Sequence, residues 1–181
     1  MDRLSLKSDL LHYKTPYATE AAFIERFLQL LEDRSNPYTR DRLHGHLTAS
    51  AWVVDPAREQ AVLILHKKLD RWLQPGGHAD GEENLIAVAR KEVEEETGLK
   101  DLKLVSEGIF DIDIHAIPAN KKDPEHDHYD IRFIFEADPN SPFLANHEVK
   151  QVAWKPLSWI NENLKSQESI IRLVQKTSAV A

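Results

Sequence analysis

The segment Gly77–Leu99, which reads GHADGEENLIAVARKEVEEETGL, constrains this chain most, because it places several acidic residues on one short stretch. Glu92, Glu95 and Glu96 have the spacing i, i+3, i+4, so a helix would bring all three onto one face. Like charges at that spacing destabilise a bare helix, whereas a hard divalent cation binds carboxylate oxygens. The segment therefore predicts a helix over about residues 85–97 that holds a metal ion.

Composition excludes several kinds of chemistry. The chain has 181 residues, 41% of them hydrophobic, which suits one domain with some elaboration. It has no cysteine, so disulfides, thiolate zinc sites and cysteine nucleophiles are excluded. A formal charge of −7 argues against binding to duplex nucleic acid. No signal peptide or membrane-spanning run is evident, and we expect a soluble, cytoplasmic protein that does not bind a membrane.

The apolar periodicity predicts an α+β fold. Asn84 is a plausible N-cap and Gly98 a plausible stop for the acidic helix. Other predicted helices cover residues 18–34 and 159–176, and predicted strands cover residues 48–55, 61–67, 102–115, 127–136 and 150–155. The first two strands are separated by Asp55-Pro56 and are expected to form a hairpin.

The acidic segment resembles the Nudix box. The positions in register are Gly77, Glu83, Glu92, Val93, Glu95, Glu96, Gly98 and Leu99. One position departs, because Lys91 stands where the family has arginine, with Arg90 beside it. Lysine keeps the charge but lacks the planar fork of a guanidinium.

The resemblance implies a fold and an activity. The fold would be an α/β/α sandwich around a mixed β-sheet, with an extra N-terminal helix. Residues 1–42 would form a helical extension packed on the domain, and residues 43–181 the Nudix domain. The activity would be metal-dependent hydrolysis of a pyrophosphate bond in a nucleoside diphosphate derivative, by attack of a water activated by Mg²⁺ or Mn²⁺.

The resemblance also implies site residues. The metal ligands would be the Gly76 carbonyl, Glu92, Glu95 and Glu96, with Glu83 as a supporting carboxylate. The catalytic residues would be Glu92, Glu95 and Glu148. The general base would be Glu92 or Glu148, and the alternative for Glu148 is a solvated loop residue. Glu94 would point elsewhere.

A second polar cluster follows from strand alternation. Asp111, Asp113 and His115 share one parity, as do His126, His128, Asp130 and Arg132. If these strands pair antiparallel, the two polar faces would lie side by side, with His78 near them. The predicted substrate-binding residues are His78, Asp113, His115, His126, His128 and Arg132. Two alternatives stay open, an ordinary solvent-facing strand pair and an additional transition-metal site. Surface or structural roles are favoured for His12, His44, His46, His66 and His147.

The competing function is a catalytically weak Nudix-fold sensor or interaction module, which the Lys91 departure favours. An isopentenyl-diphosphate isomerase-like activity is disfavoured because it relies on a cysteine. Trp72 and Tyr129 could each stack on a base or belong to the core or rim. The expected partner is a small nucleotide or diphosphate, and the protein would be a monomer or homodimer. No residue pattern names the substrate.

Overall fold

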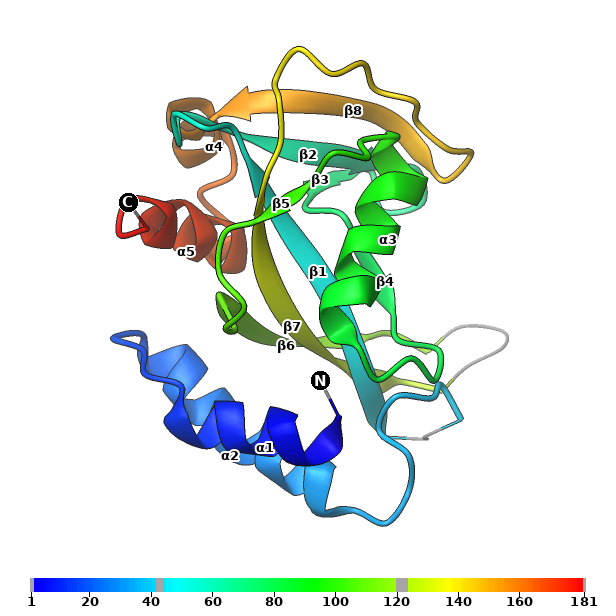
Figure 1. Cartoon of the computed structure of the whole chain (residues 1–181). Helices are drawn as coiled ribbons and strands as arrows, with labels where there is room; N and C mark the ends of the chain where they lie inside the picture. Colours follow the sequence, from blue (N-terminus) through cyan, green and yellow to red (C-terminus); the bar gives the residue numbers. More distant parts are fainter. Residues whose placement is uncertain (1, 42–43, 120–123, 181) are drawn as a thin grey trace. The chain divides into compact units, whose positions relative to one another are not determined.

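The computed structural model describes residues 2–41, 44–119 and 124–180 and divides into two compact units. The first unit contains Met1–Ser50, Gly77–Ala89 and Gly108–Phe133, and the second contains Ala51–Gly76, Arg90–Glu107 and Ile134–Ala181. Helix α3 (Leu85–Thr97) and strands β1 (Gly45–Val54) and β7 (His126–Glu136) contribute residues to both units (Figure 1). The predicted boundary between residues 42 and 43 lies outside the described residues and stays a prediction.

The predicted α+β class is confirmed, with a mixed β-sheet and helices beside it. The other elements are α1 (Arg3–His12), α2 (Ala18–Glu32), β2 (Gln60–His66), β3 (Arg71–Leu73), β4 (Gly76–His78), β5 (Lys103–Leu104), β6 (Asp111–Ile117), β8 (Val149–Pro156), α4 (Leu157–Asn163) and α5 (Glu168–Thr177). No helix in the described part of the chain combines the length and apolar character needed to cross a bilayer.

Two helices, rather than the one predicted, precede the first strand. Helix α2 matches the predicted helix over residues 18–34, whereas α1 has only a weak apolar pattern and was not predicted. Helix α1 begins where the Asp2 carboxylate accepts the Ser5 N–H at 2.9 Å. The Arg3 side chain donates to the Leu31 carbonyl at 2.6 Å, so α1 lies beside α2.

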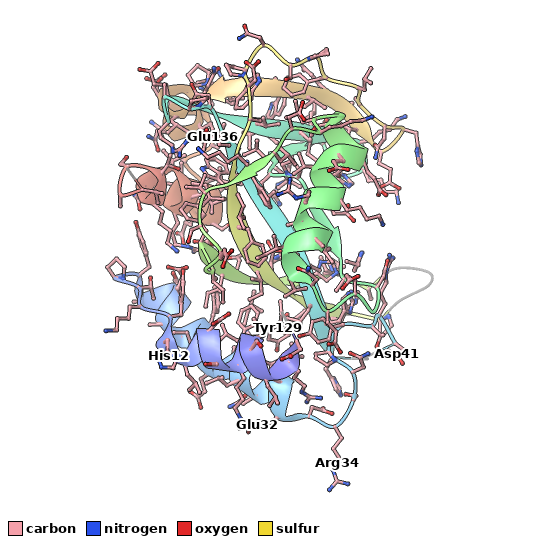
Figure 2. The ribbon with its side chains drawn as sticks, in the orientation of Figure 1. His12, Glu32, Arg34, Asp41, Tyr129 and Glu136 are labelled. Carbon is pink, nitrogen blue, oxygen red and sulfur yellow. The ribbon has the colours of Figure 1, made fainter. Side chains whose placement is uncertain are left out.

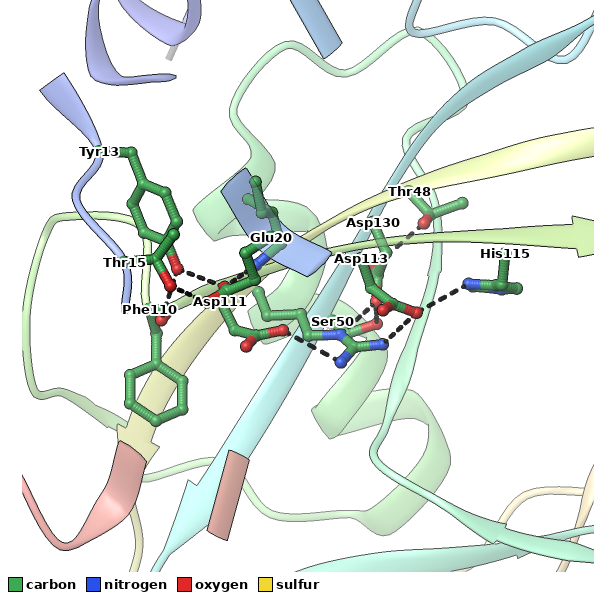
Figure 3. Close-up of polar contacts among 12 residues, drawn as sticks. Tyr13, Thr15, Glu20, Thr48, Ser50, Phe110, Asp111, Asp113, His115 and Asp130 are labelled. Atoms are coloured by element: carbon green, nitrogen blue, oxygen red, sulfur yellow. Dashed lines mark hydrogen bonds and ion pairs between the residues drawn. The ribbon is translucent and has the colours of Figure 1, made fainter. Parts of the chain in front are cut away.

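Strands β6 and β7 pair antiparallel, which confirms the predicted pairing. The register places Asp113 opposite Asp130 and His115 opposite His128. Helix α2 is anchored to β6 by buried Glu20, whose carboxylate accepts the N–H of Ile112 at 3.2 Å (Figure 3). The polar face predicted from strand alternation is therefore assembled within the first unit.

The second unit contains the predicted hairpin of β1 and β2, with Val54 opposite Ala61. The Asp55 carboxylate closes its turn by accepting the N–H groups of Glu59 and Gln60 at 2.9 and 3.0 Å. Strand β2 also pairs antiparallel with β3 and β8. These pairings place Gly76, at the start of β4, and the loop before β8 in the same unit.

Two predicted elements are each divided in two. The strand predicted over residues 102–115 is the short β5 followed by β6, with an irregular stretch between them. The helix predicted over residues 159–176 is α4 and α5, because the chain turns where the Gln167 N–H donates to the Leu164 carbonyl at 2.9 Å. Apolar periodicity continues through both breaks, so it did not reveal them.

Candidate functional site

Helix α3 forms where the sequence predicts it. Its N-terminus is capped because the Asn84 side-chain oxygen accepts the Ala87 N–H at 3.2 Å. Its C-terminus is followed by Gly98, whose φ of +80° is the left-handed conformation that glycine adopts at low cost. The buried residues of the helix are Leu85, Val88, Ala89, Val93, Glu96 and Thr97. Burial of an acidic residue among these apolar ones is the unusual feature of the helix.

Glu96 is only 6% exposed, and its carboxylate accepts the Gly76 N–H at 3.1 Å. Burial raises the pKa of Glu96 to about 8 against the opposing effect of that hydrogen bond. The charges of Glu92, Glu148 and Glu95 raise the same pKa further. Three carboxylates from the helix and the loop before β8 therefore act on Glu96 in the second unit.

Glu95 and Glu148 are the exposed members of this group. The Glu95 carboxylate lies 3.4 Å from the Lys91 ammonium group, one helical turn back, and both side chains are more than half exposed. Glu148 is held through its backbone, because its N–H donates to the Asn146 side chain at 2.9 Å and its carbonyl accepts the Lys67 N–H at 3.0 Å. The Glu148 side chain is thus positioned while its carboxylate stays accessible to a ligand.

Glu148 is one of five residues that line a surface hollow. The lining residues are His66, Lys67, Lys68, His147 and Glu148. Lys67 donates to the His147 carbonyl at 3.3 Å, which ties the end of β2 to the loop before β8. Two lysines and Glu148 thus lie around one hollow in the second unit.

The donor set of Glu92, Glu95, Glu96 and Glu148 fits a hard divalent cation. Carboxylate oxygens are the ligands that Mg²⁺ and Mn²⁺ take, and a cation would relieve the repulsion that raises the Glu96 pKa. The Gly76 N–H donates to the Glu96 carboxylate, so this glycine lies beside the acidic residues. The role of the Gly76 carbonyl as a metal ligand stays a prediction, as do the ligand roles of the glutamates.

Arg90 does not take the place of the missing arginine at position 91. Its guanidinium donates to the Leu102 carbonyl at 2.7 Å and lies over the Phe135 ring at 5.1 Å. These contacts hold the helix against its neighbours in the second unit. Lys91, paired with Glu95, is thus the cation that accompanies the acidic face.

Glu83, the predicted supporting carboxylate, is exposed and belongs to the first unit. Its charge acts on Tyr38, whose pKa is raised to about 12 by burial and then by Glu83. A supporting role for Glu83 at the metal stays a prediction.

Arg132 is buried in the polar cluster predicted from strand alternation. Its guanidinium forms ion pairs with Asp111 at 3.1 Å, Asp113 at 3.2 Å and Asp130 at 2.8 Å. Burial alone would lower the Arg132 pKa, but the three aspartates outweigh it and raise that pKa. Figure 3 shows the aspartates converging. Substrate contact by Arg132 and Asp113 stays untested, and this burial favours a structural role.

Asp130 is held from a second strand as well. Its carboxylate accepts the hydroxyl groups of Thr48 and Ser50, both buried on β1, at 3.0 and 2.9 Å. The aspartates of the cluster are thus occupied by Arg132 and by hydroxyl groups.

The histidines lie close together at the other end of the same strands, around His46, a residue that was not predicted to bind substrate. His46, expected to have a surface or structural role, is 3% exposed, and its ring centroid lies 5.1 Å from that of His78 and 5.0 Å from that of His128. The signal was present, because His46, Thr48 and Ser50 alternate with apolar residues along β1. The predicted His126 and His115 lie at the edge of this group, with centroids 5.3 and 5.4 Å from His128.

The two aromatic candidates for base stacking already have partners. The Lys155 ammonium group lies 4.3 Å from the Trp72 ring centroid, and the Trp159 ring lies 6.3 Å from Trp72. Tyr129, labelled in Figure 2, makes an edge-to-face contact with Phe27 at 5.3 Å. Tyr129 thus packs against α2, which favours its predicted role in the core.

The chain was compared with protein-family models, curated proteins and solved structures. A family model described as NUDIX domain matches residues 44–175. No curated protein matches the chain. Among solved structures, a C. elegans Ap4A hydrolase binary complex matches with a TM-score of 0.56 and 19% identity, covering 74% of this chain and 95% of that one. A Clostridium perfringens NUDIX family hydrolase gives 0.54 and 20%, covering 81% and 100%. The E. coli dihydroneopterin triphosphate pyrophosphohydrolase gives 0.55 and 11%, covering 74% and 97%. At these identities the structural matches show a common fold.

Proposed function

The chain belongs to the Nudix family, and from that premise we propose that it hydrolyses a pyrophosphate bond in a nucleoside diphosphate derivative, using Mg²⁺ or Mn²⁺. The family generally carries out this class of reaction. The observation that carries the proposal is the group of four carboxylates around buried Glu96, with the Gly76 N–H on its carboxylate. Such a group is costly without a cation and fits one well.

Glu92 and Glu96 are the proposed principal ligands, one helical turn apart on α3, and Glu95 and the Gly76 carbonyl complete the set. The bound ion would neutralise phosphate charge and acidify a coordinated water. Glu96 is positioned by its burial and by the Gly76 N–H, so its carboxylate is held in place before substrate binds. Glu95 is exposed and paired with Lys91, and it can adjust when a phosphate arrives.

Glu148 is the proposed proton acceptor for the attacking water, with Glu92 as the other candidate. Its carboxylate is exposed, and the residue lines the hollow together with Lys67 and Lys68. The lysines would hold phosphate oxygens next to the carboxylate, and the backbone contacts of Glu148 keep the loop in register. Removal of the Glu148 carboxylate should lower kcat more than it raises KM.

The proposal is tested by following the cleavage products of a panel of substrates, which are phosphomonoesters or pyrophosphate, by chromatography. The purified chain is incubated with nucleoside triphosphates, ADP-ribose, nucleotide sugars, NADH, CoA and dinucleoside polyphosphates, with Mg²⁺, Mn²⁺ or EDTA. We expect a metal-dependent activity on at least one member. In Glu92→Gln it should fall by roughly 10²–10⁴-fold, the range for loss of an acid–base group.

Glu94→Gln is the matched control, because Glu94 lies two residues from Glu92 on α3, is exposed, and loses the same charge on substitution. It should keep the parent activity. An equal loss in both variants would show that only net helix charge matters. Absence of turnover across the panel, together with tight nucleotide binding by calorimetry, would instead support the sensor or interaction module.

A further inference from the structure

Three imidazoles from three separate strands converge in the first unit, whereas Glu92, Glu95 and Glu96 belong to the second. His46 comes from β1, His78 from the end of β4 and His128 from β7. One ligating nitrogen of each lies within 4.8 Å of the other two, and the Nε2 atoms of His78 and His128 are 3.2 Å apart. Two nitrogens on one tetrahedral zinc ion, each at about 2.0–2.1 Å, would lie about 3.3 Å apart.

Backbone geometry brings these strands close enough for the rings to meet. The His44 carbonyl accepts the Asp127 N–H at 3.2 Å, which places the start of β1 beside β7. Gly45 has a φ of +147°, and a Cβ there would lie 2.5 Å from the Asp127 carbonyl oxygen. Only glycine allows that approach, and the next residue, His46, is thereby directed at His128.

His46 is buried without a polar partner. Its side chain is 3% exposed, and neither ring nitrogen has a hydrogen-bond partner among the described residues. A buried imidazole without partners carries a desolvation cost that a bound ion would offset. The Thr48 and Ser50 hydroxyl groups further along the same face of β1 are, by contrast, bonded to Asp130.

Outer contacts orient the neighbouring rings. The Nδ1 atom of His126 lies 2.8 Å from the Pro124 carbonyl, which fixes the proton on Nδ1, and the ring stacks on His46 at 5.1 Å. The Nδ1 atom of His115 lies 3.5 Å from Asp113. These contacts orient the two histidines that flank the three proposed ligands.

We propose that His46, His78 and His128 form a binding site for one first-row transition-metal ion, with Zn²⁺ as the reference ion, separate from the carboxylate site on α3. Imidazole nitrogens favour Zn²⁺ and its neighbours, whereas Mg²⁺ prefers the oxygens of the acidic helix. Three protein ligands leave a coordination position open to water or to an oxygen of a ligand. The site thus adds a second, chemically distinct metal to the proposed hydrolase.

The test is a Co²⁺ titration of the full chain, stripped with EDTA and then held in excess Mg²⁺ to occupy carboxylate sites. Visible ligand-field absorption reports four-coordinate Co²⁺. We expect one ion per chain with an intense visible spectrum that Zn²⁺ abolishes by displacement. His78→Gln and His128→Gln should each weaken binding by more than the roughly 10–100-fold that loss of a supporting residue causes.

Two control variants isolate the site. His12→Gln removes an exposed histidine on α1, labelled in Figure 2, and Glu92→Gln alters only the carboxylate site. Both should keep the parental Co²⁺ spectrum. Loss of the spectrum in Glu92→Gln, or its persistence in both ligand variants, would overturn the proposal. Absence of Co²⁺ and Zn²⁺ binding would also overturn it.

A measurement on the parent chain keeps the test decisive if a variant fails to fold. Imidazole nitrogen resonances are recorded by NMR before and after one equivalent of Zn²⁺. Coordination should shift one ring nitrogen in each of His46, His78 and His128, while His12 and His147 stay unchanged. Shifts at other histidines, or at none, would refute the assignment. Because neither readout involves hydrolysis, failure here leaves the proposed function untouched.

Discussion

Gly98→Ala should destabilise the protein by more than the cost of placing an alanine in the left-handed backbone conformation of Gly98. Gly98 ends α3 with a φ of +80°, and an added Cβ would lie 2.7 Å from the Leu144 Cβ and 2.8 Å from the Leu144 nitrogen. That nitrogen donates to the Thr97 carbonyl at 2.8 Å, so the backbone contact that would be disturbed also ties the loop before β8 to the helix. The same loop carries Glu148.

Two costs contribute to the effect. A side chain in the left-handed conformation costs roughly 1–2 kcal/mol, partly offset by about 0.4–1 kcal/mol from the less flexible unfolded chain. Overpacking against a neighbour that cannot give way adds roughly 1–3 kcal/mol. A net loss of about 2–4 kcal/mol in the free energy of unfolding is therefore expected, since the Leu144 backbone nitrogen cannot rotate away.

Gly81→Ala is the matched control. Gly81 has a φ of +89°, yet its nearest neighbour to an added Cβ is the Thr39 methyl group at 4.0 Å. It should lose only the conformational part, about 1 kcal/mol or less. Urea unfolding followed by tryptophan fluorescence gives the free energy of unfolding of both variants. In thermal unfolding, each kcal/mol lost should lower Tm by about 2–4 °C. If Gly98→Ala were no less stable than Gly81→Ala, the steric argument would be refuted.

Three further predictions follow from single contacts. Lys91→Arg should keep or raise turnover without changing stability, since the Lys91 ammonium group is exposed and forms an exposed pair with Glu95. A large loss of turnover would assign the lysine a task of its own. Arg132→Met should lower the free energy of unfolding in urea by about 3–5 kcal/mol, because it leaves three buried aspartates without their cation. Arg26→Met, which breaks an exposed pair, should lower it by less than about 1 kcal/mol. Similar losses in the two variants would contradict the importance of burial. The pKa of Tyr38 in the folded state is raised from 10.0 to about 12, so its stabilising contribution is complete below about pH 10 and is lost as the pH rises toward about 12. Tyr38→Phe should therefore reduce the loss of unfolding free energy between about pH 9 and 11. An unchanged dependence of that free energy on pH would rule the tyrosine out as its source.

The sequence alone determined the elements whose signals are local. The acidic helix, its Asn84 cap and its Gly98 stop depend on spacing and on residues a few positions apart, and all three are where the sequence predicts them. The hairpin at Asp55 and the pairing of β6 with β7 follow from turn chemistry and alternation in the same way. Local periodicity did not reveal α1 or the breaks in two predicted elements, because tertiary contacts outweigh weak propensity there.

Only the tertiary structure decided which polar residues share an environment. Asp111, Asp113 and Asp130 had the parity of metal ligands, yet a buried Arg132 pairs with all three. His46 was not selected from the sequence, although its alternation with apolar residues was visible there. It is the buried member of the histidine group, because β1 meets β7 through a close approach at Gly45. Spacing along a strand fixes the face on which a side chain lies. Pairing between strands distant in sequence fixes what that side chain meets, and this depends on backbone contacts that no single segment encodes.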